Sequence, residues 1–234
     1  MKRLFVFCPY VVLLAGLCSG PFAGAQSNPL LEKVLDEMDA AGKSFRATQA
    51  SFDWDDYTSV VKEHLEQKGT IYFRRSGDET QVAIDIKTPH PKYLVLTGGI
   101  LQIFDPRQDQ VTMYNLQKSH PEFESFLVLG FGGGGHSLLK SFDVSYAGTD
   151  MIDGKETSKL DLVPKSPKAQ QMFPHIVLWI DPDRGISVQQ KLFQGEGDYR
   201  LAVYSDIQLK QKIPDSVFKL KTDTKTTFQK MSSD

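Results

Sequence analysis

Apolar and polar residues alternate with a period of two along most of the chain from about residue 51 onward. In the stretch GTIYFRR, Ile71 and Phe73 share one face, and Thr70 and Tyr72 share the other. This period is typical of β-strands that bury one face. Turn signals separate the runs at Gly98-Gly99, Asp105-Pro106-Arg107, Asp153-Gly154 and Gly195-Glu196-Gly197. The pattern predicts ten or eleven antiparallel strands that follow one another in chain order.

Before this region, apolar residues recur with a helical period near 3.6. It predicts a helix over residues 29–50, with Asn28 as its cap, Pro29 in its first turn and Gly42 as a stop or kink. One apolar face of this helix consists of Leu30, Leu31, Val34, Leu35, Met38 and Ala41.

A second helical segment is expected over residues 119–141, in the middle of the strands. Ser119 followed by Pro121 is a favourable helix start, and Phe126 and Leu127 lie on one side of the predicted helix. The stretch GFGGGGH, residues 130–136, interrupts it. Consecutive glycines have wide backbone freedom, so this stretch is interpreted as a hinge or as a surface loop.

Residues 1–25 have the three parts of a secretory signal peptide: a basic start, a short apolar run and small residues before Gln26. The apolar run is about 14 residues, fewer than the roughly 20 needed to span a bilayer. A second interpretation is lipidation at Cys18, since LLAGLC resembles a lipoprotein cleavage box. Cys8 and Cys18 are the only cysteines, so a chain that starts at Gln26 has no thiol. These features predict a secreted protein.

Residues 26–234 are long enough for one domain, which we expect to be mainly β with helices (α+β). The formal net charge is −2, and loss of Lys2 and Arg3 with the signal peptide changes it to −4. Nothing in this balance suggests binding to nucleic acid, which favours a basic surface.

The sequence contains no arrangement of residues that argues for catalysis or for a cofactor. The histidines, at positions 64, 90, 120, 136 and 175, lack partners at metal-ligand spacing. Asp53, Asp55 and Asp56 could form an acid–base pair, but a solvated face is the simpler interpretation. Ser137 does not stand in a nucleophile-elbow motif. We therefore expect a binding protein with no cofactor and no metal.

The apolar faces of the strands can either fill a solid core or line a cavity for an apolar ligand, and periodicity alone does not separate the two. The ordered series GTIYFRR, QVAIDI and PKYLVLTGGILQIFDPRQDQVTMYNL, however, resembles the periplasmic outer-membrane lipoprotein carrier family, the LolA-like proteins. The later stretches KLDLVPK, IVLWIDPDRGISVQQKLF and YSDIQLKQKIPDSVFKL also match that family's pattern. The resemblance covers about residues 30–222.

The resemblance implies an unclosed antiparallel β-barrel whose hydrophobic cavity is covered by the N-terminal helix and a helical lid. It further implies a monomeric carrier that binds the acyl chains of lipoproteins or other lipids and delivers them towards the outer membrane. An inner-membrane release complex and an outer-membrane acceptor would be its partners. The alternative within the same fold is a sensor or another lipid-binding module.

Strand alternation and the resemblance together assign side chains to this cavity. The expected lining consists of Val82, Ile84, Ile86, Ile103, Leu160, Leu162, Ile176, Leu178 and Ile180, with Phe126 and Leu127 from the lid and Phe45 and Trp54 as weaker candidates. By resemblance, Arg75 would latch the lid, although Ser76 stands where the family often has proline. Gly132, Gly133, Gly134 and Gly135 are the predicted lid hinge.

Overall fold

The computed structural model describes residues 28–77, 79–116, 126, 129–210 and 212–231. The predicted signal peptide, Leu127 and most of residues 119–128 lie outside the described residues. No helix in the described part of the chain is long and apolar enough to cross a membrane.

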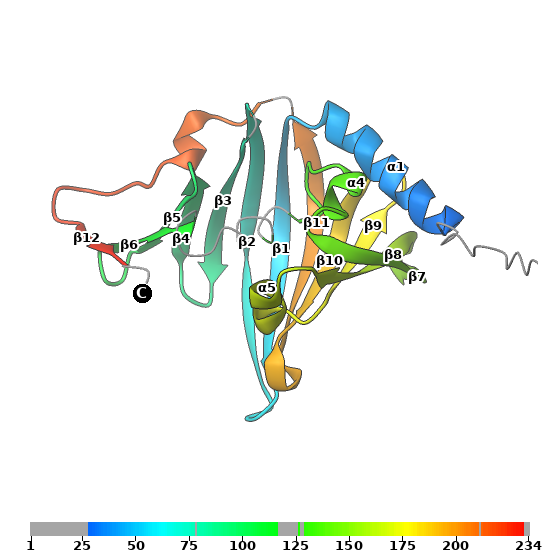
Figure 1. Ribbon diagram of the computed structural model, residues 1–234. Helices are drawn as coiled ribbons and strands as arrows, with labels where there is room; N and C mark the ends of the chain where they lie inside the picture. The colour runs from blue at the N-terminus through cyan, green and yellow to red at the C-terminus, as the bar shows by residue number, and fades with distance from the viewer. Residues whose placement is uncertain (1–27, 78, 117–125, 127–128, 211, 232–234) are drawn as a thin grey trace, which may run out of the picture.

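Twelve strands form one twisted sheet in the order β12-β6-β5-β4-β3-β2-β1-β11-β10-β9-β8-β7 (Figure 1). The strands are β1 (Ala47–Thr58), β2 (Glu63–Ser76), β3 (Glu79–Thr88), β4 (Lys92–Thr97), β5 (Ile100–Asp105), β6 (Gln110–Asn115), β7 (Phe142–Ile152), β8 (Lys155–Pro164), β9 (Ile176–Asp181), β10 (Ile186–Phe193), β11 (Tyr199–Lys210) and β12 (Thr227–Lys230). The end strands β7 and β12 do not pair, so the barrel stays unclosed.

The predicted antiparallel pairing in chain order is confirmed within β1–β6 and within β7–β11, but it was wrong at the junction, because β6 and β7 are not neighbours in the sheet. Strand β12 pairs in parallel with β6, beginning where Thr227 faces Gln110. Pairing between β1 and β11 joins the first half of the chain to the second. The predicted turn at Asp153-Gly154 has both residues at positive φ, 49° and 75°, which matches the twist of a two-residue hairpin.

The N-terminal helix α1 (Pro29–Ser44) begins as predicted, because the Asn28 side chain accepts a hydrogen bond from the Leu30 amide. It is shorter than the predicted 29–50. Phe45 is already extended, and β1 begins at Ala47. The prediction was wrong here because residues 47–49 pair with both β2 and β11, Ala50 pairs with β2, and this pairing outweighs the helical pattern.

Within the described residues, the other helical elements that have defined bounds are short: α4 (Gly135–Leu138), α5 (Pro167–Met172), η1 (Gly195–Gly197) and η2 (Asp215–Phe218). Helix α4 is the resumed turn expected after the glycines. It packs against α1 near one end of the sheet (Figure 1).

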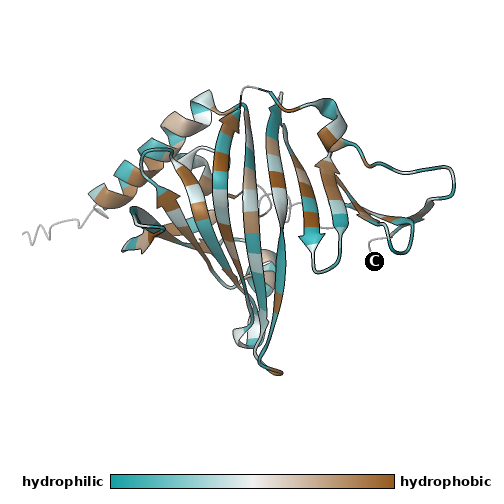
Figure 2. Cartoon of the chain, turned by 180° about the vertical axis from the view of Figure 1, so that it is seen from behind, coloured by the Kyte–Doolittle hydropathy of each residue, from teal (hydrophilic) through white to brown (hydrophobic). Residues whose placement is uncertain are grey.

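The two faces of the sheet have different covers. We call the face under α1 and residues 129–139 the inner face, and the face under residues 212–220 the outer face. Apolar and polar positions alternate along the strands, as Figure 2 shows. Val82 and Ile84 therefore point to the inner face, whereas Ala83 packs on the outer face with Ile213 and Phe218.

Candidate functional site

The inner face contains two apolar clusters, and the residues predicted to line a cavity divide between them. The first cluster contains Val82, Ile84 and Ile86, with Ile103 partly buried against it. The second contains Leu160, Leu162, Ile176, Leu178 and Ile180, together with Phe126. Strand alternation therefore identified the correct face of each strand. Trp54 and Phe45 also belong to the first cluster.

Aromatic side chains from the segment between β6 and β7 cover both clusters. Phe131 is fully buried, and its ring centroid lies 4.3 Å from that of Phe73 in a stacked arrangement and 4.9 Å from that of Tyr204. Phe126 meets Phe173 edge-on, with 4.9 Å between centroids. Phe73, Tyr204 and Phe173 were not among the predicted cavity residues, because an isolated aromatic residue carries no separate signal in a sequence.

Arg75 ties this segment to α1. Its Nη1 donates a hydrogen bond of 2.9 Å to the carbonyl of Gly42, near the end of α1, and its Nη2 donates one to the carbonyl of Gly132. The guanidinium carbon also lies 5.8 Å from the ring centroid of Phe45. Arg75 therefore contacts both elements that cover the inner face. Its role as a lid latch stays a prediction.

The neighbouring Arg74 points to the opposite face of the sheet and contacts a different segment. Its guanidinium forms an ion pair of 2.6 Å with Asp215, donates to the carbonyl of Ile213 at 3.1 Å and stacks 4.1 Å from the centroid of Phe218. Of these two adjacent arginines, Arg75 is therefore the one that contacts the lid segment, by which we mean residues 129–139.

The glycines of residues 130–135 lie in tight contact with their surroundings. Gly130 and Gly132 have positive φ values of 77° and 72°. A Cβ on Gly134 would lie 2.5 Å from Asp39 Oδ1, and one on Gly135 would lie 2.5 Å from the Leu35 Cα. Gly133, by contrast, is exposed and would meet only Ser137 Oγ at 3.8 Å. Gly134 and Gly135 thus allow close approach to α1, while Gly130 and Gly132 pack against Ser187 and Phe45, so most of the stretch is not a loose surface loop. Its role as a hinge stays a prediction.

His136 follows the glycines and lies between two carboxylates of α1. Its Nδ1 is 2.6 Å from Asp39 Oδ2, and its Nε2 is 3.1 Å from Glu32 Oε2. The hydrogen bonds with Asp39 and then Glu32 raise the pKa of His136 above its usual value. His136 looks like a lone histidine in the sequence because its partners are about 100 residues away.

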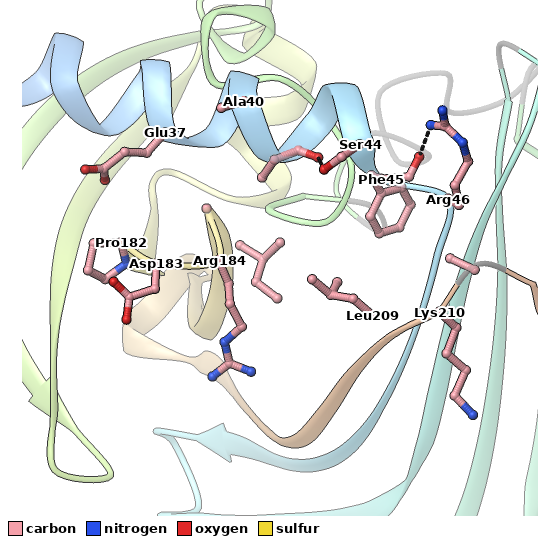
Figure 3. A pocket seen from close by; sticks show the side chains of 14 residues that line it. Glu37, Ala40, Ser44, Phe45, Arg46, Pro182, Asp183, Arg184, Leu209 and Lys210 are labelled. Atoms are coloured by element: carbon pink, nitrogen blue, oxygen red, sulfur yellow. Dashed lines mark hydrogen bonds between the residues drawn. The ribbon is translucent and has the colours of Figure 1, made fainter.

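A cavity of about 500 Å³ opens beneath α1 (Figure 3). Phe45, Ile186 and Leu209 supply apolar surface, and Leu209 is 56% exposed. Glu37 on α1 and Arg184 on the opposite side supply charges at its edge (Figure 3). Its volume is in the range of small-molecule sites. None of the strand residues predicted to line a cavity borders it.

Two smaller cavities lie where the lid segment meets the second cluster. One, of about 340 Å³, is lined by Phe126, Phe142 and Ala169 among others. The other, of about 150 Å³, is lined by Met38, Leu129 and Leu138 among others. Phe126 is thus the one predicted lid residue within the described chain, and it borders a cavity.

The residues considered for catalysis have ordinary partners. Asp53 pairs with Lys68 at 2.5 Å, and Asp56 pairs with Arg200 at 2.6 Å. Asp55 lies 2.9 Å from His64 Nδ1. The Ser137 hydroxyl donates to the carbonyl of Gly134 in its own turn. Each of these contacts is one that surface strands and turns commonly make.

The comparisons with known proteins agree with this architecture. No curated protein matches the chain in sequence. An uncharacterised conserved protein from Thermus thermophilus has a similar structure, with a TM-score of 0.54 at 9% identity over 86% of this chain and 98% of that one. MucB has a TM-score of 0.50 at 13% identity, over 83% of this chain and 64% of that one. Lipoprotein LppX from Mycobacterium tuberculosis has a TM-score of 0.47 at 14% identity, over 80% of this chain and all of that one.

At these identities the likenesses to the Thermus thermophilus protein and to MucB show a shared fold and nothing further. The sequence provides the family: the family model described as outer membrane lipoprotein carrier protein LolA matches residues 43–221. That range includes every described strand of the sheet except β12 and contains the arginine and glycine contacts of the lid segment. The chain belongs to the LolA family of outer membrane lipoprotein carrier proteins.

Proposed function

We propose that this protein is a periplasmic carrier that binds the acyl chains of lipoproteins or related lipids on its inner face. It would collect them from an inner-membrane release complex and deliver them to an outer-membrane acceptor. The observation that carries the proposal is the lid segment over the inner face. Phe131 of this segment is buried against Phe73, and Arg75 donates hydrogen bonds both to this segment and to α1. Family membership supports the same class of cargo.

The arrangement suggests how cargo enters. The rings of Phe126 and Phe131 occupy the apolar space that an acyl chain would need, so uptake requires the lid segment to move. Burying one methylene group contributes about 0.8 kcal/mol, and a chain of about fifteen methylenes therefore contributes about 12 kcal/mol. Releasing one buried phenylalanine and its ring contact costs about 2–4 kcal/mol. An acyl chain can therefore displace the aromatic side chains, whereas water cannot.

Binding and release of this kind need no bond to be broken. The protein would act as a binding protein and not as an enzyme, and transfer would follow when a partner binds the acyl chain more tightly or stabilises the open lid. The cavity beneath α1, between Phe45 and Leu209, provides apolar surface next to the first cluster through which a chain could enter.

The test is site-specific photo-crosslinking in cells, with the photoreactive residue at Ile84 on the inner face. The matched control places it at Asp85, the next residue, on the outer face and partly exposed. We expect acylated lipoproteins or lipids, identified by mass spectrometry, at Ile84 and not at Asp85. Equal products at both positions, or none at Ile84 from a folded and exported protein, would contradict the proposal.

A second candidate is a sensing module of the same fold. MucB shares this fold, and one solved structure holds MucB in complex with MucA. In the crosslinking experiment, a sensor would give one constant protein partner and no acylated cargo at Ile84.

A further inference from the structure

The glycine-rich stretch brings His136 onto a row of acidic side chains on α1. Glu32, Asp36 and Asp39 are spaced by four and three residues, so they lie along one face of the helix. Gly134 permits the approach, because a Cβ there would lie 2.5 Å from Asp39 Oδ1. Two segments about 100 residues apart thus supply an imidazole and carboxylates to one cluster.

The geometry of this cluster fits a metal ion. One ligand atom each from Asp36, Asp39 and His136 lies within 4.8 Å of the other two. Ligands about 2.1 Å from one ion at the tetrahedral angle are about 3.4 Å apart, so small side-chain rotations bring these atoms into place. Asp36 is exposed, and Asp39 and His136 are half-buried, which leaves room for a water molecule as a fourth ligand.

Glu32 completes the arrangement from the other side of the ring. Its Oε2 lies 3.1 Å from His136 Nε2, while Nδ1 faces Asp39. A histidine that binds a metal through one nitrogen usually donates the other N–H to a carboxylate, which orients the ring. A hydrogen bond from Nε2 to Glu32 would present the Nδ1 lone pair to an ion between Asp36 and Asp39.

We propose that Asp36, Asp39 and His136 bind a divalent transition-metal ion of the Zn²⁺ type across the junction of α1 and α4. One imidazole with two carboxylates matches the ligand preference of Zn²⁺, whereas Mg²⁺ and Ca²⁺ prefer oxygen ligands alone. A bound ion would fasten residues 134–138 to α1. The proposal concerns the apo protein and a metal, and it does not depend on which cargo the inner face binds.

The test is titration of ZnCl₂ into the purified, untagged protein by isothermal titration calorimetry. We expect one site per chain, with MgCl₂ giving no comparable heat. Asp36→Asn is the decisive variant, because Asp36 is exposed and makes no hydrogen bond to His136 within the described residues, so the fold does not depend on its charge. Zinc affinity should fall at least tenfold in Asp36→Asn and in His136→Ala. Glu32→Gln should weaken it about tenfold through the ring orientation.

His175→Ala is the matched control. His175 also pairs with one aspartate, since its Nδ1 lies 3.2 Å from Asp161 Oδ1, but no metal-ligand cluster within the described chain includes it. Zinc should bind this variant as it binds the wild type, and should slow hydrogen exchange in residues 134–138 of both. Zinc binding that persists in Asp36→Asn and His136→Ala, or no zinc binding by the folded wild type, would overturn the proposal.

Discussion

Replacement of Arg75 by methionine tests whether this side chain holds the lid segment against the inner face. Methionine keeps most of the apolar stem and removes the guanidinium. The variant therefore loses the hydrogen bonds to the carbonyls of Gly42 and Gly132, together with the contact above Phe45. The strand itself should persist, since the Arg75 amide bonds to the carbonyl of Arg46.

The magnitude follows from the type of contact that is lost. A hydrogen bond from a charged donor contributes about 1.5–3 kcal/mol when buried. Arg75 is only partly buried, so the two bonds together are expected to contribute about 2–3 kcal/mol. Because 1.4 kcal/mol is a factor of ten, the open population of the lid segment should rise roughly 30- to 150-fold. Arg75→Lys should restore the closed lid segment only in part, because an ammonium group lacks the planar guanidinium geometry that reaches two carbonyls.

Hydrogen–deuterium exchange followed by mass spectrometry measures this opening directly. We expect faster exchange in residues 129–139 of Arg75→Met, with β8 and β9 unchanged. Arg74→Met is the matched control on the adjacent residue, and its faster exchange should fall in residues 212–218, which it anchors through Asp215. If Arg75→Met leaves the exchange of residues 129–139 at the wild-type rate, the latch interpretation is refuted.

Three further predictions concern stability. Gly135→Ala should lower the free energy of unfolding by about 1–3 kcal/mol, because its Cβ would press on the Leu35 backbone, whereas Gly133→Ala should change it by less than about 0.5 kcal/mol. Urea denaturation compares the two variants, and equal losses of stability would argue against close packing of this stretch. Phe131→Ala should lower the free energy of unfolding by about 3 kcal/mol or more yet increase the binding of a fluorescent fatty-acid probe. Loss of both stability and probe binding would argue that the Phe131 ring does not occupy the space that the acyl chain needs. Burial alone would raise the pKa of Asp181, but its contacts with Lys155 at 2.7 Å and Arg184 at 2.6 Å lower that pKa overall. The stability that Asp181 contributes is therefore present above its unfolded pKa of about 3.9 and is lost as the pH falls through the lower folded pKa. The difference in unfolding free energy between wild type and Asp181→Asn should therefore be largest near neutral pH and shrink below about pH 4, and a difference independent of pH would contradict this reasoning.

The sequence by itself determined most of the strands, the turns between them and the face that their apolar residues take. Alternation is a local property, and it correctly placed Val82 and Ile84 on the inner face, since successive side chains of a strand point to opposite sides. The start of α1 was equally predictable, because a cap and its apolar stripe lie within a few residues of each other. The ordered series of strand motifs was sufficient to identify the family.

Only the tertiary structure decided which strands and side chains that lie far apart in the chain contact one another. The end of α1 depends on the pairing of Ala47 with β2 and β11, and the parallel pairing of β12 with β6 joins residues more than 100 positions apart. Long-range contacts likewise bury Phe131 against Phe73, give Arg75 its partners and place His136 beside carboxylates. A run of glycines signals backbone freedom in any sequence, but whether that freedom serves motion or close packing depends on the atoms beside it. Here those atoms belong to α1, and a Cβ at Gly135 would meet the Leu35 backbone, so the packed helix leaves space for glycine alone at that position.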